Sequence, residues 1–117
     1  MTDDEKAQEL ADAIRALGDV FVGRLPATMS SIDDELALIS QDHQVLTPWQ
    51  NLHRQLHSMA GSAGTFGYPE LGDKARALEL RAGDIFRSET MTTEENRANF
   101  VADLRTYMAW VSQNFIK

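Results

Sequence analysis

The stretch that decides the fold runs from position 52 to position 67 and reads Leu52-HRQLHSMAGSAGTF-Gly67. A helix turns by about 100° per residue, and at that angle the apolar side chains of this stretch fall in one narrow stripe. The stripe consists of Leu52, Leu56, Met59, Ala63 and Phe66. The stretch therefore predicts an amphipathic helix whose striped face lies in the core.

Capping residues and prolines predict where this helix and its neighbours begin and end. Thr47, Pro48 and Gln50 are typical of a helix start, because threonine caps the first turn, proline is tolerated there and glutamine can close a capping box. Gly67-Tyr68-Pro69-Glu70 predicts a glycine stop followed by a proline start, with a tight connection between two helices. Thr92-Thr93-Glu94-Glu95 predicts a second capping box, which opens the last helix.

The first third of the chain also carries apolar residues at helical spacing. They are Leu10, Ile14, Leu17, Phe21, Leu25, Met29, Ile32, Leu36 and Ile39. Gly18-Asp19 and Pro26 are the plausible breaks, because proline disrupts a helix interior but is tolerated in a first turn. The pattern fits two helices or one kinked helix, and we favour a short helix followed by a longer one.

These patterns together predict an all-α fold. Short connections between helices of similar length imply antiparallel neighbours. We therefore expect an up-down antiparallel four-helix bundle with an additional short N-terminal helix. The 117 residues suffice for one compact core, so we expect residues 1–117 to form a single domain.

Composition excludes several classes of function. The chain has no cysteine, which removes disulfides, thiolate metal sites and cysteine nucleophiles. Its 18 acidic and 11 basic residues give a net charge of −7, which repels nucleic-acid backbones and anionic membranes. No apolar run approaches the roughly 20 residues that cross a bilayer, and the start Met1-Thr2-Asp3-Asp4-Glu5 does not resemble a signal peptide. We expect a cytoplasmic monomer that binds neither nucleic acid nor membrane.

A second face of the predicted helix over residues 52–67 gathers two histidines and three small residues. They are His53, His57, Ala60, Gly61 and Gly64. The two glycines together cost about 2 kcal/mol of helix stability relative to alanine. Either they clear the approach to a nucleophilic imidazole, or they allow close helix packing and His57 is an incidental surface residue. The residue pattern alone leaves both interpretations open.

A resemblance to a known family rests on the same stretch. The run HSMAGSAGTFG from His57 to Gly67, followed by Leu71, Ala75 and Leu78-Glu79, resembles the signature of histidine phosphotransfer (HPt) domains of two-component phosphorelays. The resemblance implies that His57 accepts a phosphoryl group from a receiver-domain aspartate and passes it to another receiver. It also implies that Gly61 leaves room for the partner's active site. The implied partners are response-regulator receiver domains or hybrid sensor kinases, with magnesium on the receiver and no cofactor on this chain.

One position departs from the family pattern. Members usually carry lysine three residues after the histidine, where it helps to neutralise the phosphoryl group, and this sequence has Ala60 there. Arg54 could reach the same flank, although its helical angle points it further round, and it could equally be a solvated surface charge. We predict His53, Arg54, Ala60, Gly61 and Gly64 as partner-binding residues around His57.

The chemistry of histidine suits this task. A histidine with the ordinary pKa of about 6.5 is mostly neutral near pH 7 and presents an unprotonated nitrogen as nucleophile without a dedicated base. The receiver and its magnesium ion would supply most of the charge stabilisation in the transition state. Because the sequence contains no nucleotide-binding motif, we expect a phosphoryl carrier without ATP-dependent kinase activity.

A metal site and a second function compete with phosphotransfer as interpretations of these residues. His53 and His57 are four residues apart and could share a transition metal, but two nitrogens alone make a weak site, so we expect no metal. The alternative function is a non-catalytic helical adaptor that binds a receiver domain or another signalling protein without being phosphorylated.

Overall fold

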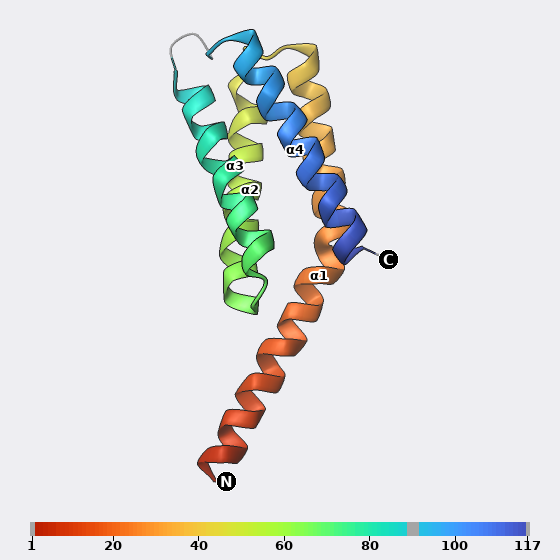
Figure 1. Cartoon of the computed structure of the whole chain (residues 1–117), viewed down its shortest axis with the longest axis vertical. Coiled ribbons are helices and arrows are strands. Elements are labelled where there is room, and N and C mark those ends of the chain that lie inside the picture. The colour runs from red at the N-terminus through yellow and green to blue at the C-terminus, as the bar shows by residue number, and fades with distance from the viewer. Residues whose placement is uncertain (1, 89–91, 117) are drawn as a thin grey trace.

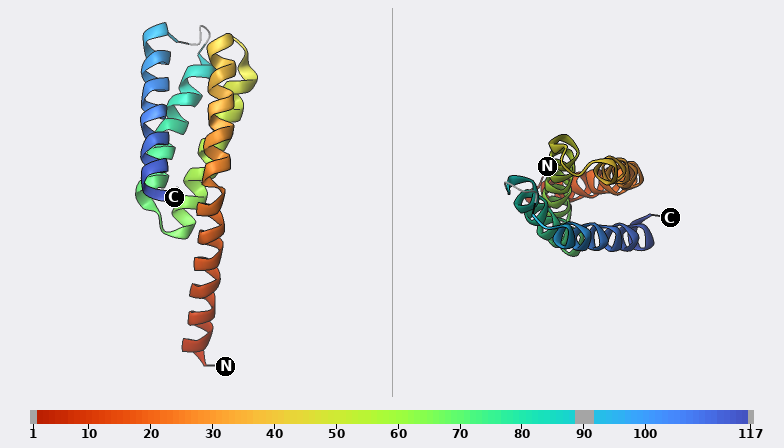
Figure 2. Two further views of the ribbon diagram at one scale, coloured as in Figure 1. Left: turned by 90° about the vertical axis from the view of Figure 1, so that its right-hand side faces the viewer. Right: turned by 90° about the horizontal axis from the view of Figure 1, so that it is seen from above.

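The structure, a computed structural model, describes residues 2–88 and 92–116 and contains four helices (Figure 1). They are α1 (Asp3–Gln41), α2 (Leu46–Phe66), α3 (Pro69–Arg87) and α4 (Glu94–Phe115). The described residues form no strand. Helix α1 contacts α2 and α4, and α3 contacts the same two helices, so the four helices close around a common core (Figure 2). The all-α four-helix bundle predicted from the sequence is confirmed.

The predicted additional short N-terminal helix is wrong. Helix α1 is continuous over 39 residues, and Gly18-Asp19 and Pro26 both lie inside it. Proline inside a helix costs about 3 kcal/mol, because one hydrogen bond is lost and the ring crowds the preceding turn. Leu25 and Met29 are buried on either side of Pro26, whose own ring is exposed, so packing on the bundle keeps both turns in one register.

The start of α2 also differs from the prediction. The helix begins at Leu46, its N-cap residue is Val45, and no side chain caps it, so Thr47 is not the cap. The connection from α1 is held instead by the buried Trp49, whose Nε1 donates to the carbonyl of His43 at 2.9 Å. Tertiary anchoring of the indole replaces the local cap that the sequence predicts.

The predicted boundary between α2 and α3 agrees with the structure, and the predicted start of α4 is shifted by one residue. Gly67 ends α2 in the left-handed conformation, with a φ of 84°, and Pro69 opens α3 directly afterwards. Helix α4 is capped by Thr93, whose hydroxyl accepts from the backbone amide of Asn96 at 3.1 Å. The helix therefore starts one residue later than a capping box on Thr92 requires.

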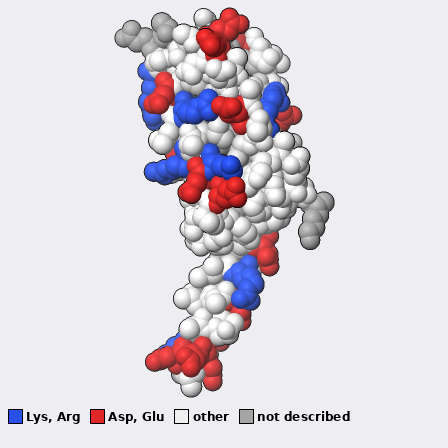
Figure 3. All heavy atoms as spheres, viewed as in Figure 1, with Lys and Arg blue, Asp and Glu red and all other residues white. Residues whose placement is uncertain are grey.

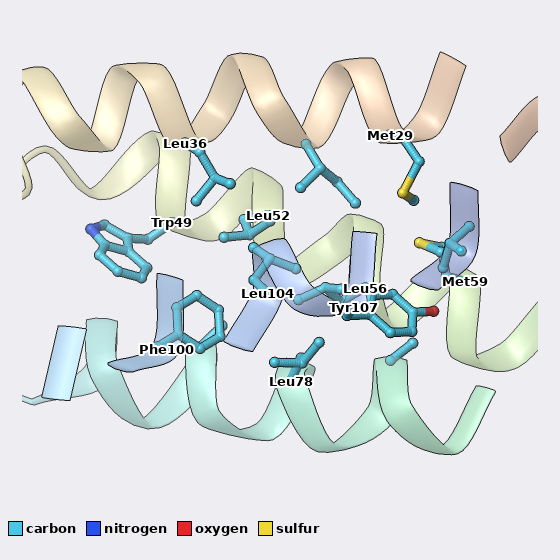
Figure 4. Packing of buried hydrophobic residues seen from close by; sticks show 14 of the residues in the cluster. Met29, Leu36, Trp49, Leu52, Leu56, Met59, Leu78, Phe100, Leu104 and Tyr107 are labelled. Atoms are coloured by element: carbon cyan, nitrogen blue, oxygen red, sulfur yellow. The ribbon is translucent and has the colours of Figure 1, made fainter. Parts of the chain in front are cut away.

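The core joins all four helices (Figure 4). The apolar stripe predicted for α2 is buried from Leu52 to Ala63, and its last member, Phe66, is half-buried. Between α3 and α4, the Tyr107 hydroxyl donates to the carbonyl of Leu71 at 2.9 Å, and burial raises the pKa of the Tyr107 phenol. This bond fixes α4 against the start of α3.

The first part of α1 projects beyond the bundle (Figures 1 and 2). Leu10, Ile14 and Leu17 remain 63%, 39% and 56% exposed, so the apolar residues at helical spacing in this part of the chain do not join the core. The cause is length, because α1 has 39 residues whereas the other helices have 19 to 22 and end before they reach these side chains. No helix in the described part of the chain is long and apolar enough to span a membrane.

Candidate functional site

The candidate site is centred on His57, on the side of α2 that faces α3. The His57 side chain is 66% exposed, while its partner Glu79 on α3 is only 7% exposed. The His57 Nδ1 lies 3.0 and 3.1 Å from the two carboxylate oxygens of Glu79. One edge of the imidazole is therefore anchored to a buried group, and the rest of the ring is open to solvent.

The Glu79 contact determines which ring nitrogen is free. A carboxylate has no hydrogen to donate, so the His57 Nδ1 carries the hydrogen and donates it to Glu79. In the neutral ring the other nitrogen, Nε2, is then unprotonated and holds a lone pair. The arrangement thus presents a fixed nucleophilic nitrogen on an exposed imidazole.

Gly61 and Gly64 lie one and two turns beyond His57 on α2. A Cβ added at either position would meet no neighbouring atom within 4 Å. Close helix packing among the described residues therefore does not require these two glycines, which removes one of the two interpretations of the sequence pattern. The surface beside His57 is bare without a packing reason.

The glycine that packing does require is Gly72 on α3. A Cβ there would lie 3.2 Å from both the carbonyl oxygen of Ala60 and the Cβ of Ala63. These contacts are tighter than ordinary van der Waals distances, so Gly72 lets α3 approach the backbone of α2. This close approach brings the α3 side chains up to the His57 face.

A shallow groove of about 310 Å³ runs between α2 and α3 beyond His57. It is lined by Ala60, Gly61, Gly64, Pro69, Gly72, Asp73 and Arg76. Arg76 is exposed, and within residues 2–88 and 92–116 it has no hydrogen bond or ion pair. It precedes Glu79 by three residues, so both side chains leave the same side of α3 one turn apart. An unpaired guanidinium therefore lies one turn from the carboxylate that holds His57.

Arg54 and His53 occupy different surroundings. The Arg54 Nη2 donates to the Oδ1 of Asn51 at 2.6 Å, and Asn51 itself donates to Glu35 of α1 at 3.2 Å. Arg54 is thus tied towards α1 and not towards the groove. The His53 ring packs edge-on against Phe86 of α3, with 5.5 Å between ring centroids. His53 therefore belongs to the α2–α3 contact one turn before His57.

A family model for the Hpt domain matches residues 4–110. The chain belongs to the Hpt domain family. No curated protein and no solved structure matches it significantly. Hpt domains are helical bundles that act with receiver domains of two-component systems, and the bundle described above agrees with that membership.

This Hpt domain contains three site features that the sequence reasoning missed: the role of Glu79, the close approach at Gly72 and the unpaired Arg76. Glu79 had a signal in the sequence, because it is four residues after Ala75 and three before Ala82, on the edge of the apolar stripe of α3. A charged residue buried at such a position needs a hydrogen-bonding or charged partner. Which α2 residue faces it depends on the pairing of two helices, and helical spacing within one segment does not specify that pairing.

Proposed function

We propose that this Hpt domain accepts a phosphoryl group on His57 Nε2 from the aspartyl phosphate of a receiver domain and returns it to a second receiver. The observation that carries the proposal is the exposed imidazole held through Nδ1 by the buried Glu79. It combines access for a partner with a fixed orientation and a free nitrogen, which is what a nucleophile in an in-line displacement needs.

The proposed step is a displacement at phosphorus. The Nε2 lone pair attacks the phosphoryl group, the N–P bond forms, and the P–O bond to the receiver aspartate breaks to release its carboxylate. The Nδ1 hydrogen stays on the ring, and the Glu79 carboxylate balances the positive charge that the ring acquires. Transfer to the next receiver reverses these steps, and magnesium on the receiver contributes the remaining charge stabilisation.

The proposal assigns Arg76 to the phosphoryl oxygens. Ala60 supplies no charge where the family pattern usually has lysine, and Arg54 is tied to Asn51. Arg76 faces the groove beside Ala60 and Gly61 from the opposite helix. A guanidinium binds phosphate oxygens through two parallel hydrogen bonds, so a single arginine can replace the missing ammonium. Asp73 lines the same groove, and we assign its carboxylate no contact with the phosphoryl group.

A transfer assay tests the proposal. The chain is incubated with a phosphorylated receiver domain from the same organism and magnesium, and label that is acid-labile and base-stable is sought on it. We expect label on wild type, none on His57→Gln, and most of it retained on the control His53→Ala. Label on His57→Gln would refute the assignment of His57. Binding to receivers without any label would favour the non-catalytic adaptor.

A further inference from the structure

Arg87, the last residue of α3, holds its guanidinium over Gly83, one turn earlier on the same helix. A Cβ added at Gly83 would lie 2.7 Å from Arg87 Nη1 and 3.4 Å from Arg87 Cζ. The same Cβ would lie 3.4 Å from Cδ2 of His53 on α2. Gly83 therefore leaves a space between the α3 backbone and His53, which we call the Gly83 seat, and the Arg87 guanidinium occupies it.

The guanidinium lies in this seat although its own helix offers an acidic partner. Asp84 precedes Arg87 by three residues, and the same spacing joins Asp12 to Arg15 at 3.1 Å in α1. Arg87 forms no hydrogen bond or ion pair with any residue in 2–88 and 92–116, and its Cζ lies 5.2 Å from the centroid of the Phe86 ring. An exposed positive charge is thus held in one place without an acidic partner among these residues.

The seat supplies a reason for a glycine at position 83. Glycine inside a helix is less favourable than alanine, and Gly83 lies well inside α3. The only atom that an added Cβ would crowd below 3 Å is the flexible end of Arg87, and 3.4 Å from His53 is an ordinary van der Waals distance. An alanine would therefore fit once Arg87 moved away, so the glycine provides room for the guanidinium.

The Gly83 seat belongs to the His57 face of the bundle. Gly83 follows Glu79 by four residues and His53 precedes His57 by four, so the seat lies one turn, about 6 Å along the helices, from the contact between His57 and Glu79. Arg76 flanks the same contact on its other side. A specific protein interface covers about 800 Å² on each partner, so a protein that reaches His57 also covers the seat.

We propose that Arg87, held over Gly83, binds a carboxylate on the docking surface of the receiver domain. The identity of that partner rests on the proposed function. The phosphoryl group is assigned to the groove at Arg76, so the anion that meets Arg87 is a side chain of the partner, and the side chains that are anionic near pH 7 are carboxylates. A guanidinium donates two parallel hydrogen bonds to a carboxylate, and holding it in place beforehand lowers the entropy lost on binding.

The charge distribution supports an acidic partner at α3. The chain has a net charge of −7, and the first turn of α1 forms an acidic tip (Figure 3). Basic side chains gather over α3 in the same view, and in the described ranges Arg76 and Arg87 of this helix have no acidic partner. Asp73 and Asp84 are exposed on α3 as well, and we assign them no contact with the receiver carboxylate.

Receiver binding by the full chain tests the role of Arg87. A receiver domain from the same organism, unphosphorylated and with magnesium, is immobilised, and association and dissociation are followed by surface plasmon resonance. Arg87→Ala should weaken binding about three- to tenfold, mainly through slower association, because charges at the edge of an interface act on encounter. The difference should shrink as salt rises. Arg15→Ala removes the same charge from the projecting part of α1 and should bind as wild type.

Gly83→Ala tests the seat without removing the charge. The variant should be at least as stable as wild type to heating, because alanine is the better helix former, and yet bind the receiver more weakly. In the Arg87→Ala background, Gly83→Ala should cause no further loss, because the seat is then empty. Circular dichroism checks that all variants keep their helices. An equal loss from Gly83→Ala in both backgrounds would show that the glycine does not act through Arg87 and would overturn the seat.

The outcomes separate this inference from phosphotransfer. If the chain acquires label and Arg87→Ala binds the receiver as tightly as wild type, the role of Arg87 is refuted and phosphotransfer stands. If Arg87→Ala weakens binding and the chain never acquires label, phosphotransfer is refuted and the role of Arg87 stands. A chain that neither binds nor is labelled by any receiver of the organism overturns both.

Discussion

The part of α2 that carries His57 and the first part of α1 are both amphipathic, yet only the α2 segment is covered on its apolar side. Leu56 of α2 is fully buried, whereas Leu10 of α1 is 63% exposed. Both leucines lie in stripes with the same spacing of three and four residues. Spacing thus shows which face of a helix is apolar, and the lengths of the neighbouring helices decide whether that face becomes core.

The strongest test of this contrast compares Leu56→Ala with Leu10→Ala. Leu56→Ala should lower the free energy of unfolding by about 2–5 kcal/mol, because it leaves a cavity among four packed helices. Leu10→Ala should change it by less than about 0.5 kcal/mol, because an exposed side chain loses few contacts and alanine favours the helix. Urea unfolding at low micromolar protein measures both. Similar losses for the two variants would mean that the start of α1 folds back onto the bundle.

The fold was predictable wherever local chemistry decides it. The stop at Gly67 and the start at Pro69 depend on backbone preferences of those two residues, and the structure agrees. The continuity of α1 through Pro26 and the anchoring of Trp49 depend on packing between helices, and there the sequence-based predictions were wrong. Tertiary contacts override local propensity at those points.

The candidate site also has one part that the sequence of a single helix predicts and one part that depends on packing between helices. Helical angles within α2 are enough to put His57, Gly61 and Gly64 on one exposed face. The hydrogen bond of His57 with Glu79 and the groove shared with Arg76 each need the register between α2 and α3. That register is determined by the close approach at Gly72, which no spacing within a single helix specifies.

Glu79→Ala tests whether the buried carboxylate that contacts His57 is needed for transfer. Losing this carboxylate frees the imidazole to rotate and to exchange tautomers, so transfer should fall about 10- to 100-fold, by analogy with the loss when the partner of a metal-bound histidine is removed. Glu79→Gln should lose less, because its amide oxygen still accepts from Nδ1. Transfer kinetics from a phosphorylated receiver measure both variants. Wild-type rates for Glu79→Ala would show that the contact with His57 has no part in transfer.

Gly61→Gln tests whether the bare surface beside His57 is needed. Glutamine is the better helix former, so the variant should be as stable as wild type or several tenths of a kcal/mol more stable. Transfer should nevertheless fall at least tenfold, an estimate that assumes the added side chain obstructs the receiver. Gly23→Gln is the matched control, because a Cβ at Gly23 on α1 also meets no atom within 4 Å. Gly23→Gln should change the stability as Gly61→Gln does and leave the rate of transfer unchanged. Undiminished transfer by Gly61→Gln would refute the need for clearance.

The smallest expected effect concerns the charge of Arg76, which we propose to face the phosphoryl group. Arg76→Ala should slow transfer or shorten the lifetime of the phosphohistidine by two- to tenfold, because exposed charge interactions are typically worth about 1 kcal/mol or less. Ala60→Lys places an ammonium on the other wall of the same groove and should restore the Arg76→Ala variant. In the wild-type background, Ala60→Lys should lengthen the lifetime of the phosphohistidine or speed transfer by a factor similar to the loss in Arg76→Ala. Phosphohistidine decay and transfer rates at two salt concentrations measure these changes.

Salt dependence separates this electrostatic effect from a change in docking shape. Screening shortens the range of exposed charges to about 8 Å at physiological ionic strength, so the differences between Arg76→Ala, Ala60→Lys and wild type should shrink as salt rises. Arg54→Ala serves as the control, because its guanidinium is bound to Asn51 on the side towards α1, and it should leave both rates unchanged. If Arg54→Ala slows transfer while Arg76→Ala does not, the phosphoryl charge is met from the α1 side of α2. If Ala60→Lys changes nothing at either salt concentration, the receiver alone neutralises that charge, and the alanine at this position is no deficit.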